Sequence, residues 1–198
     1  MEYGALCWLS GVHIMAGVMF TRSKNLSTKE HPVWQVYDLL RTAKLNEKYF
    51  GRRLKKYVVI NNTMEFFIAA TASTSAIASL TVWSDGLGSH FWQGFLITAA
   101  VISVLKPIVG ITKRVRLYEE VLAEYRVLSF ELSQLRTSIA TEQSYKPTHQ
   151  TQFKKILAKH SALVAKTPES TENKKVKQEC EQEVLSAFPI SNFYIPES

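Results

Sequence analysis

The sequence has few of the residues from which catalytic centres, metal sites and disulfide frameworks are built. Its two cysteines, Cys7 and Cys180, lie near opposite ends of the chain and outside any CxxC motif, which argues against a disulfide framework or a CxxC site. Asp38 and Asp85 are the only aspartates. The histidines lack the spacing of a motif such as HExxH, and no P-loop, GxGxxG or GxSxG occurs. We therefore expect no enzymatic activity, no cofactor and no metal ion.

The chain carries an excess of positive charge. It has 24 Lys and Arg against 17 Asp and Glu, a formal charge of +7 over 198 residues. Such an excess favours anionic partners, among them lipid headgroups, nucleotides and nucleic acid, without choosing between them. The length suits one domain of ordinary size.

Two long apolar runs near the middle of the sequence predict a pair of membrane-spanning helices. Residues 64–83 contain one charged residue, Glu65, and residues 90–110 contain one, Lys106. Each run has about 20 residues, the length that crosses a hydrocarbon core of about 30 Å. The connector, residues 84–89, includes Asp85 and two glycines, which suit a tight turn between antiparallel helices. The alternative is a helical hairpin buried inside a soluble bundle.

The distribution of cations favours the membrane hairpin. Basic residues precede the first run and follow the second, whereas the connector has none. By the positive-inside rule, this asymmetry places both flanks of the hairpin in the cytoplasm. We therefore expect a multi-pass protein of the inner (cytoplasmic) membrane.

The flanking sequence predicts cytoplasmic helices. Residues 33–57 have helical periodicity in their apolar residues, with Glu47 interrupting the series, and are expected to run into the first span. After the second run, apolar residues at alternating spacings of three and four form a heptad seam that requires a helical partner: Tyr118, Val121, Tyr125, Leu128, Leu132, Leu135 and Ile139. Shorter helices are expected at residues 152–166 and 171–188, separated by Pro168.

The expected fold is therefore all-α, a membrane protein with a two-helix transmembrane hairpin and a cytoplasmic helical bundle or coiled coil. The predicted organisation is an apolar N-terminal segment (1–31), an amphipathic cytoplasmic helix (32–60), the transmembrane hairpin (61–110), a cytoplasmic helical region (111–188) and an extended tail (189–198). The role of residues 1–31 stays open between a third span, a hydrophobic arm, and a stretch upstream of a true start at Met15 or Met19. No basic residue precedes its apolar part, which argues against a signal peptide.

Glu65 and Lys106 are the strong charges inside the two expected spans. A charged group in lipid costs several kcal/mol unless it is paired or hydrated. In an antiparallel hairpin, both residues fall near the cytoplasmic side, so an ion pair between them is the simplest solution. The functional alternative is that one of them forms a charged ring, or gate, at a pore mouth.

The first span has a wide face of small and hydroxyl-bearing residues. On a helix, two adjacent stripes comprise Phe67, Thr71, Thr74, Ser75, Ala78, Ser79 and Thr81. Such a face could line a water-filled pore in an oligomer. It could equally pack closely against neighbouring helices, with its hydroxyls bonded to those helices or to their own backbone.

A group of cations flanks the expected spans: Arg52, Arg53, Lys55, Lys56, Lys113, Arg114 and Arg116. Membrane topology and contacts with lipid phosphates account for them. The alternative is that, in a symmetric assembly, they form a site for an anionic ligand such as a nucleotide or a single-stranded nucleic acid.

The order of these elements, with the helix RVRLYEEVLAEYRVLSFELSQL after the second run, resembles the SLATT family of prokaryotic membrane effectors from about residue 32 to residue 188. This resemblance implies a pore-forming effector that damages the membrane in anti-phage (abortive infection) defence. The chain is similar in particular to the channel-like effectors of Hailong-type defence. That similarity implies control by a nucleotide or oligonucleotide that a nucleotidyltransferase partner makes. The apolar N-terminal segment has no counterpart in the family pattern.

Two functional hypotheses follow. The first is a homo-oligomeric ion channel in the lipid bilayer, with a tetramer as the working stoichiometry, the first span around the pore and the heptad helix building the cytoplasmic assembly. The second is a non-conducting membrane scaffold or sensor whose cytoplasmic helices recruit a partner.

Overall fold

The computed structural model describes residues 31–72, 87–169 and 171–196. These residues form five α-helices and one short 3-10 helix, and the described ranges contain no β-strand. The all-α prediction is therefore confirmed. The expected N-terminal segment lies outside the described residues except for His31.

The first helix, α1 (Val33–Ala72), is a single helix of 40 residues. It joins the predicted amphipathic helix to the beginning of the first expected span without a break, as predicted from the sequence. At 1.5 Å per residue it is about 60 Å long. The second apolar run forms α3 (Leu87–Val109), so the helix begins within the predicted turn, before Gly88. The remaining helices are α4 (Ile111–Glu142), α5 (Pro147–Ala165) and α6 (Lys174–Ala187).

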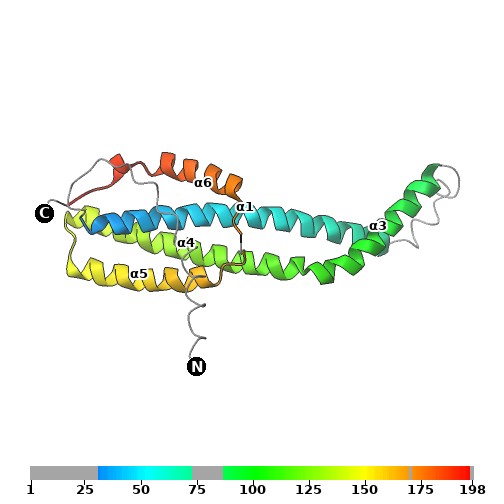
Figure 1. Cartoon of the computed structure of the whole chain (residues 1–198), viewed down its shortest axis with the longest axis horizontal. Coiled ribbons are helices and arrows are strands. Elements are labelled where there is room, and N and C mark those ends of the chain that lie inside the picture. The colour runs from blue at the N-terminus through cyan, green and yellow to red at the C-terminus, as the bar shows by residue number, and fades with distance from the viewer. Residues whose placement is uncertain (1–30, 73–86, 170, 197–198) are drawn as a thin grey trace, which may run out of the picture. The chain divides into compact units, whose positions relative to one another are not determined.

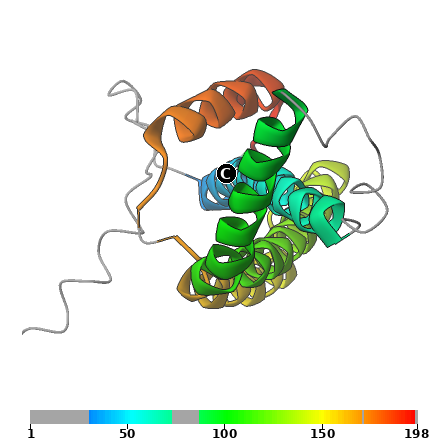
Figure 2. The same ribbon diagram turned by 90° about the vertical axis from the view of Figure 1, so that its right-hand side faces the viewer.

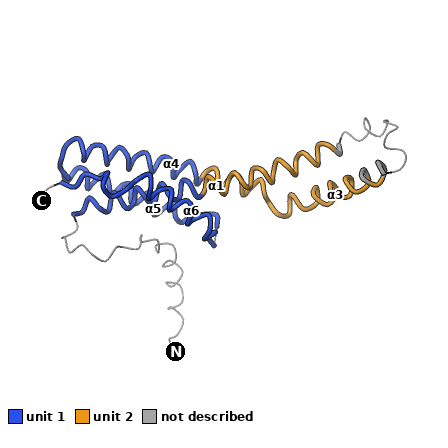
Figure 3. Tube along the Cα trace, turned by 90° about the horizontal axis from the view of Figure 1, so that it is seen from above, with its two compact units in different colours: residues 1–49, 121–198 blue, residues 50–120 orange. Residues whose placement is uncertain are grey.

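The chain divides into two compact units (Figure 3). Unit 1 comprises residues 1–49 and 121–198, and unit 2 comprises residues 50–120. Unit 1 is a helical bundle in which the beginning of α1 lies between α6 and α4, with α5 on the far side of α4 (Figure 1, Figure 2). Unit 2 contains the rest of α1, all of α3 and the beginning of α4.

The heptad seam of α4 is buried within this one chain. Its members have exposed fractions between 0% and 2%. The unit 1 part of α1 is equally apolar and buried, with six side chains that have no exposed surface: Val33, Val36, Tyr37, Leu40, Ala43 and Leu45. The seam is therefore covered within the chain itself, so an assembly of several chains would have to use other surfaces of the helix. The assembly itself stays a prediction.

Glu47, which interrupts the apolar series of α1, has polar partners in the bundle. Its carboxylate accepts a hydrogen bond from Lys44 Nζ at 2.9 Å and another from Ser129 Oγ on α4 at 2.7 Å. Burial raises the pKa of Glu47, but the hydrogen bonds from Lys44 and Ser129 outweigh burial and hold its pKa below the ordinary value of 4.5. The residue thus fixes the register of α1 against α4 as a charged group.

The two C-terminal helices match their predicted positions, with shifted ends. Helix α5 begins at Pro147 rather than at residue 152, because proline is favoured in the first turn and His149 Nδ1 accepts a hydrogen bond from the Lys146 backbone N–H. Helix α6 begins after Asn173, whose side chain accepts a hydrogen bond from Val176 N at 3.1 Å.

Residues 189–196 pack into unit 1 and are not an extended tail, which corrects the prediction for that part of the segment; residues 197–198 lie outside the described residues. A 3-10 helix, η3 (Ile190–Asn192), leads into Phe193, which is 6% exposed. The Phe193 ring stacks on Tyr37 at 4.4 Å and lies 4.9 Å from the Arg41 guanidinium carbon. Arg41 also donates two hydrogen bonds to the Phe188 carbonyl, at 2.6 and 3.1 Å. A second guanidinium, that of Arg136, lies 5.0 Å from the same ring.

We predict that Phe193→Ala releases the C-terminal segment. The loss of a buried aromatic ring and its two cation–π contacts should cost about 3 kcal/mol. Cys180, which is buried in α6, reports the release. In a Cys7→Ser background, a thiol reagent should label it about a hundred times faster in the variant. The matched control is Ile190→Ala, because Ile190 is 61% exposed; equal labelling of the two variants would contradict the anchoring role.

We predict that Glu47→Gln makes unit 1 less sensitive to acid. Since the pKa of Glu47 is lower in the folded than in the unfolded chain, its carboxylate stabilises the fold above pH 4.5, and that contribution is lost as the pH falls through the folded pKa. The variant should lose about 1–2 kcal/mol of unfolding free energy at pH 7 and show a flatter decline below about pH 5. Urea unfolding at several pH values measures this, with Glu119→Gln, an exposed carboxylate of α4, as control.

Candidate functional site

Helix α3 presents a continuous apolar stripe to the outside of the chain. The stripe has the three- and four-residue spacing of one helix face, and its members are between 45% and 73% exposed: Ile97, Val101, Val104, Leu105 and Ile108. Monomers in water seldom leave a contiguous apolar surface of this kind uncovered, so the stripe marks contact with lipid or with another chain. In the described residues, α3 is therefore not buried in a bundle formed by this chain alone.

The opposite face of α3 looks toward α1. It carries Phe95, Ala99, Ile102 and Lys106, again at spacings of three and four. Ala99 is 3% exposed, and the Phe95 ring lies 5.1 Å from the ring of Phe67 on α1. The charged residue of the helix is therefore on its inward side, and the outward stripe is wholly apolar.

The inward face brings the two expected intramembrane charges together. Lys106 Nζ lies 2.8 Å from Glu65 Oε1, with 19% and 55% of the two side chains exposed. The same carboxylate oxygen accepts a hydrogen bond from Asn61 Nδ2 at 3.0 Å, and Asn61 Oδ1 accepts one from Thr112 Oγ1 at 3.3 Å. We call Asn61, Glu65, Lys106 and Thr112 the polar cluster. It connects α1 to both α3 and α4.

The sequence predicts the ion pair of Glu65 with Lys106 but not the hydrogen bonds of Asn61 and Thr112. The spacing of Asn61 and Glu65, four residues apart on one helix, is the signal that would have placed the two side chains side by side. No comparable signal identifies Thr112, because its position depends on the bend that follows α3.

The chain bends between α3 and α4 at Gly110. The two helices meet there at 48°, and Gly110 has φ +63°, a left-handed conformation that side chains disfavour. Pro107 lies inside α3 and not at the bend. Gly110 N–H donates to the Lys106 carbonyl at 3.2 Å, and its own carbonyl accepts from Arg114 N–H at 3.1 Å.

Aromatic rings fix the beginning of α4 against α1. Tyr118, the first member of the heptad seam, is 1% exposed. Its ring lies 5.0 Å from the Tyr57 ring and 6.1 Å from the Phe50 ring. Ile111, next to the bend, is 5% exposed. The α1–α4 part of unit 2 is therefore packed, in contrast to the outward stripe of α3.

The structure separates the predicted cations into two groups. Arg52 and Arg53 are half-buried, and the Arg53 guanidinium carbon lies 5.6 Å from the centre of the Tyr57 ring. The others are exposed and form no ion pair with another described residue: Lys55, Lys56, Lys113, Arg114 and Arg116. The exposed group is the one available to phosphate oxygens of a ligand or of lipid.

Most of the predicted pore-lining face lies outside the described residues. Phe67 contacts α3, as given above, and Thr71 belongs to the last described turn of α1. Thr74, Ser75, Ala78, Ser79 and Thr81 lie outside the described residues. That their hydroxyl-bearing stripe lines a pore therefore stays a prediction.

By length and composition, no single helix in the described ranges qualifies as a membrane span. The bent pair formed by residues Gln93–Val109 and Ile111–Glu142 does qualify.

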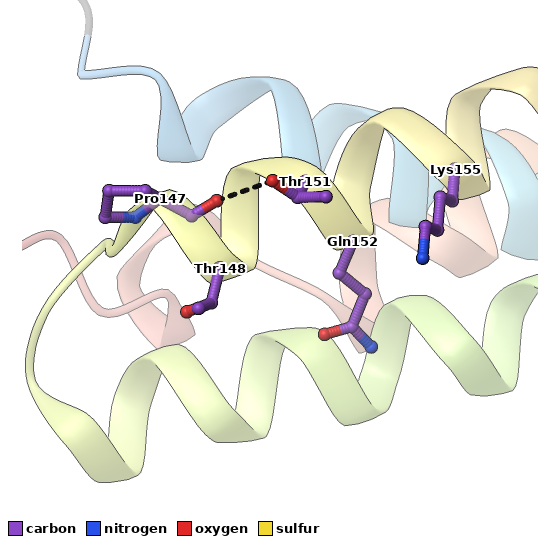
Figure 4. A pocket seen from close by; sticks show the side chains of 5 residues that line it. All are labelled: Pro147, Thr148, Thr151, Gln152 and Lys155. Atoms are coloured by element: carbon purple, nitrogen blue, oxygen red, sulfur yellow. Dashed lines mark hydrogen bonds between the residues drawn. The ribbon is translucent and has the colours of Figure 1, made fainter.

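Unit 1 offers no comparable site in its described part. A shallow pocket on α5 is lined by exposed residues of that helix alone, and Thr151 Oγ1 there donates to the Pro147 carbonyl of the preceding turn (Figure 4). Burial raises the pKa of Tyr125 to about 12 and lowers the pKa of His160, which keeps both side chains neutral at neutral pH. Among the described residues, no group of three His, Cys, Asp or Glu side chains could hold a metal ion.

Comparison of the chain with protein-family models, with curated proteins and with solved structures found no match. The function proposed below is therefore inferred from the geometry of unit 2 and from the sequence.

Proposed function

We propose that the chain is an integral membrane protein whose α1 and α3 form a hairpin in the bilayer, and that several copies assemble into an ion-conducting pore. The observation that carries the membrane assignment is the apolar stripe of α3. Its large side chains are exposed on one face, and the charge of the helix is turned inward to a carboxylate. In lipid, the stripe meets hydrocarbon and the charge is already paired.

The cations support the same orientation. Lys55 and Lys56 precede Glu65 on α1 by nine to ten residues, and Lys113, Arg114 and Arg116 follow Lys106 by seven to ten. Because Glu65 and Lys106 are in contact, both groups lie about 10–15 Å along their helices from that pair. They are suited to the headgroup level of the cytoplasmic leaflet, with unit 1 in the cytoplasm and the membrane being the inner one.

Assembly must use surfaces other than the heptad seam, which is buried. One hairpin cannot enclose a pore, so conduction requires an oligomer, with a tetramer as the working number. The hydroxyl-bearing face of the first span is the proposed lining. The resemblance to SLATT effectors supports a role in anti-phage defence. It also suggests a gating ligand, a nucleotide or single-stranded oligonucleotide from a nucleotidyltransferase partner, bound at the exposed cations.

The second candidate is a non-conducting membrane scaffold. The compact bundle of unit 1 favours it, because a bundle with its own closed core can bind a partner without any pore. In that case the hairpin is an anchor, and the small residues of the first span only pack helices.

We predict that Val104→Glu reduces retention of the protein in membranes. A carboxylate on the lipid-facing stripe should cost about 2–3 kcal/mol of insertion free energy, whereas the same change on a water-exposed surface costs little. The fraction of full-length protein in a carbonate-washed membrane pellet measures this. Phe130→Glu, at an exposed apolar position of unit 1, is the matched control. Wild-type protein in the supernatant without detergent would refute the membrane assignment.

We predict that purified protein in liposomes conducts ions, and that a short single-stranded oligonucleotide changes the flux. Replacing Lys113, Arg114 and Arg116 together with Gln should abolish the response to the oligonucleotide and leave the basal flux, because these side chains are exposed and form no ion pair with another described residue. Replacing Lys154 and Lys155, exposed cations of α5, is the control. Absence of flux under all conditions would leave the scaffold as the function.

A further inference from the structure

We propose that Gly110 is a hinge and the Glu65–Lys106 ion pair is its latch, so that α3 moves against α1 by rotation about Gly110 when the protein changes state. That this movement gates a pore rests on the proposed function. The movement itself can be measured without any conduction.

The polar cluster brackets the bend. Lys106, on α3 before Gly110, is held by Glu65 at 2.8 Å, and Thr112, on α4 after Gly110, is held by Asn61 at 3.3 Å. Asn61 and Glu65 lie one turn apart on α1 and are bonded to each other at 3.0 Å. One face of α1 therefore holds the chain on both sides of the hinge, and each contact can be removed separately.

The backbone between these two contacts is weakly constrained. Pro107 has no N–H, so the helix lacks one hydrogen bond in the last turn of α3. Gly110 is in the left-handed region at φ +63°, and no atom lies within 4 Å of the position that a Cβ would occupy there. No side chain beyond its chain neighbours lies over Gly110, so its conformation is held by the backbone hydrogen bonds to Lys106 and Arg114.

The two sides of the hinge are held unequally. On the α4 side, Ile111 and Tyr118 are buried at 5% and 1% exposure, and Tyr118 packs on Tyr57. On the α3 side, Val104, Leu105 and Ile108 are exposed, and the ion pair is the polar contact with α1. Ala99 and the Phe95–Phe67 ring contact also hold α3 to α1, farther from the bend. Loss of the ion pair therefore removes the polar contact next to Gly110 and loosens that end of α3 while α4 stays in place, which makes α3 the moving part.

The direct test is the distance between α1 and α3 in full-length protein reconstituted in liposomes. Spin labels on Val59→Cys and Ile97→Cys, both at exposed positions, in a Cys7→Ser background and diluted with unlabelled protein, report it by pulsed electron spin resonance. We expect one narrow distance distribution for the wild type and an added, longer component for Lys106→Gln. The charge swap Glu65→Lys with Lys106→Glu should restore the narrow distribution. Glu119→Gln, which removes an exposed carboxylate of α4, should leave it unchanged.

Gly110→Ala tests the hinge independently of the latch. A Cβ at this position meets open space but disfavours positive φ, so the variant should shift the distribution without a packing defect. In the same liposomes, ion flux should rise about twofold to fivefold in Lys106→Gln, the factor expected of a partly exposed ion pair, and return to the wild-type value in the charge swap.

The two readouts separate the possible failures. Distances that are identical in the wild type, Lys106→Gln and Gly110→Ala overturn the hinge and the latch, whatever the flux. Distances that change as expected in a protein that never conducts support the hinge and overturn the pore. A charge swap that behaves like Lys106→Gln would show that the pairing of the two charges is not what holds α3.

Discussion

The structure depends on the burial of one seam, the heptad face of α4 against the first part of α1. The seam contributes the fully buried Leu132, Leu135 and Ile139, and α1 supplies an equally buried set opposite it. Helices α5 and α6 and the docked C-terminal segment then cover this pair. Apolar burial of this extent is the dominant stabilising term in a small helical domain. Polar side chains inside the bundle, such as Glu47 and Arg41, fix the register of α1 against the elements packed on it.

Unit 2 has the opposite distribution of apolar residues. In unit 1 most large apolar side chains are inside, together with a few bonded charges such as Arg41, whereas α3 turns its apolar stripe outward and its single charge inward. The same helix-packing rules produce both arrangements when the surroundings differ. A helix in water gains free energy by hiding its apolar face, and a helix in hydrocarbon has no such gain and must instead satisfy its polar groups.

The fold could be predicted from the sequence to a large extent, because helical periodicity, proline and capping residues are local signals. The heptad residues from Tyr118 to Ile139 and the pairing of Glu65 with Lys106 are recognisable for that reason. The helix that covers the seam could not be identified from the sequence, because a heptad pattern predicts that a partner helix is needed but not which chain provides it. Phe193 could not be placed either: a single aromatic residue in a polar C-terminal stretch gives no periodic signal, and its site is formed by Tyr37, Arg41 and Arg136, which are far away in sequence.

Unit 1 is discontinuous in sequence, and this determines the order in which the chain can fold during synthesis. The first part of α1 leaves the ribosome with Val36 and Leu40 unprotected, and its partner α4 is made only after the entire hairpin. Long-range contacts of this kind form late and leave apolar surface open to aggregation. The apolar face of the first part of α1 therefore stays uncovered until Leu132 and its neighbours have been translated.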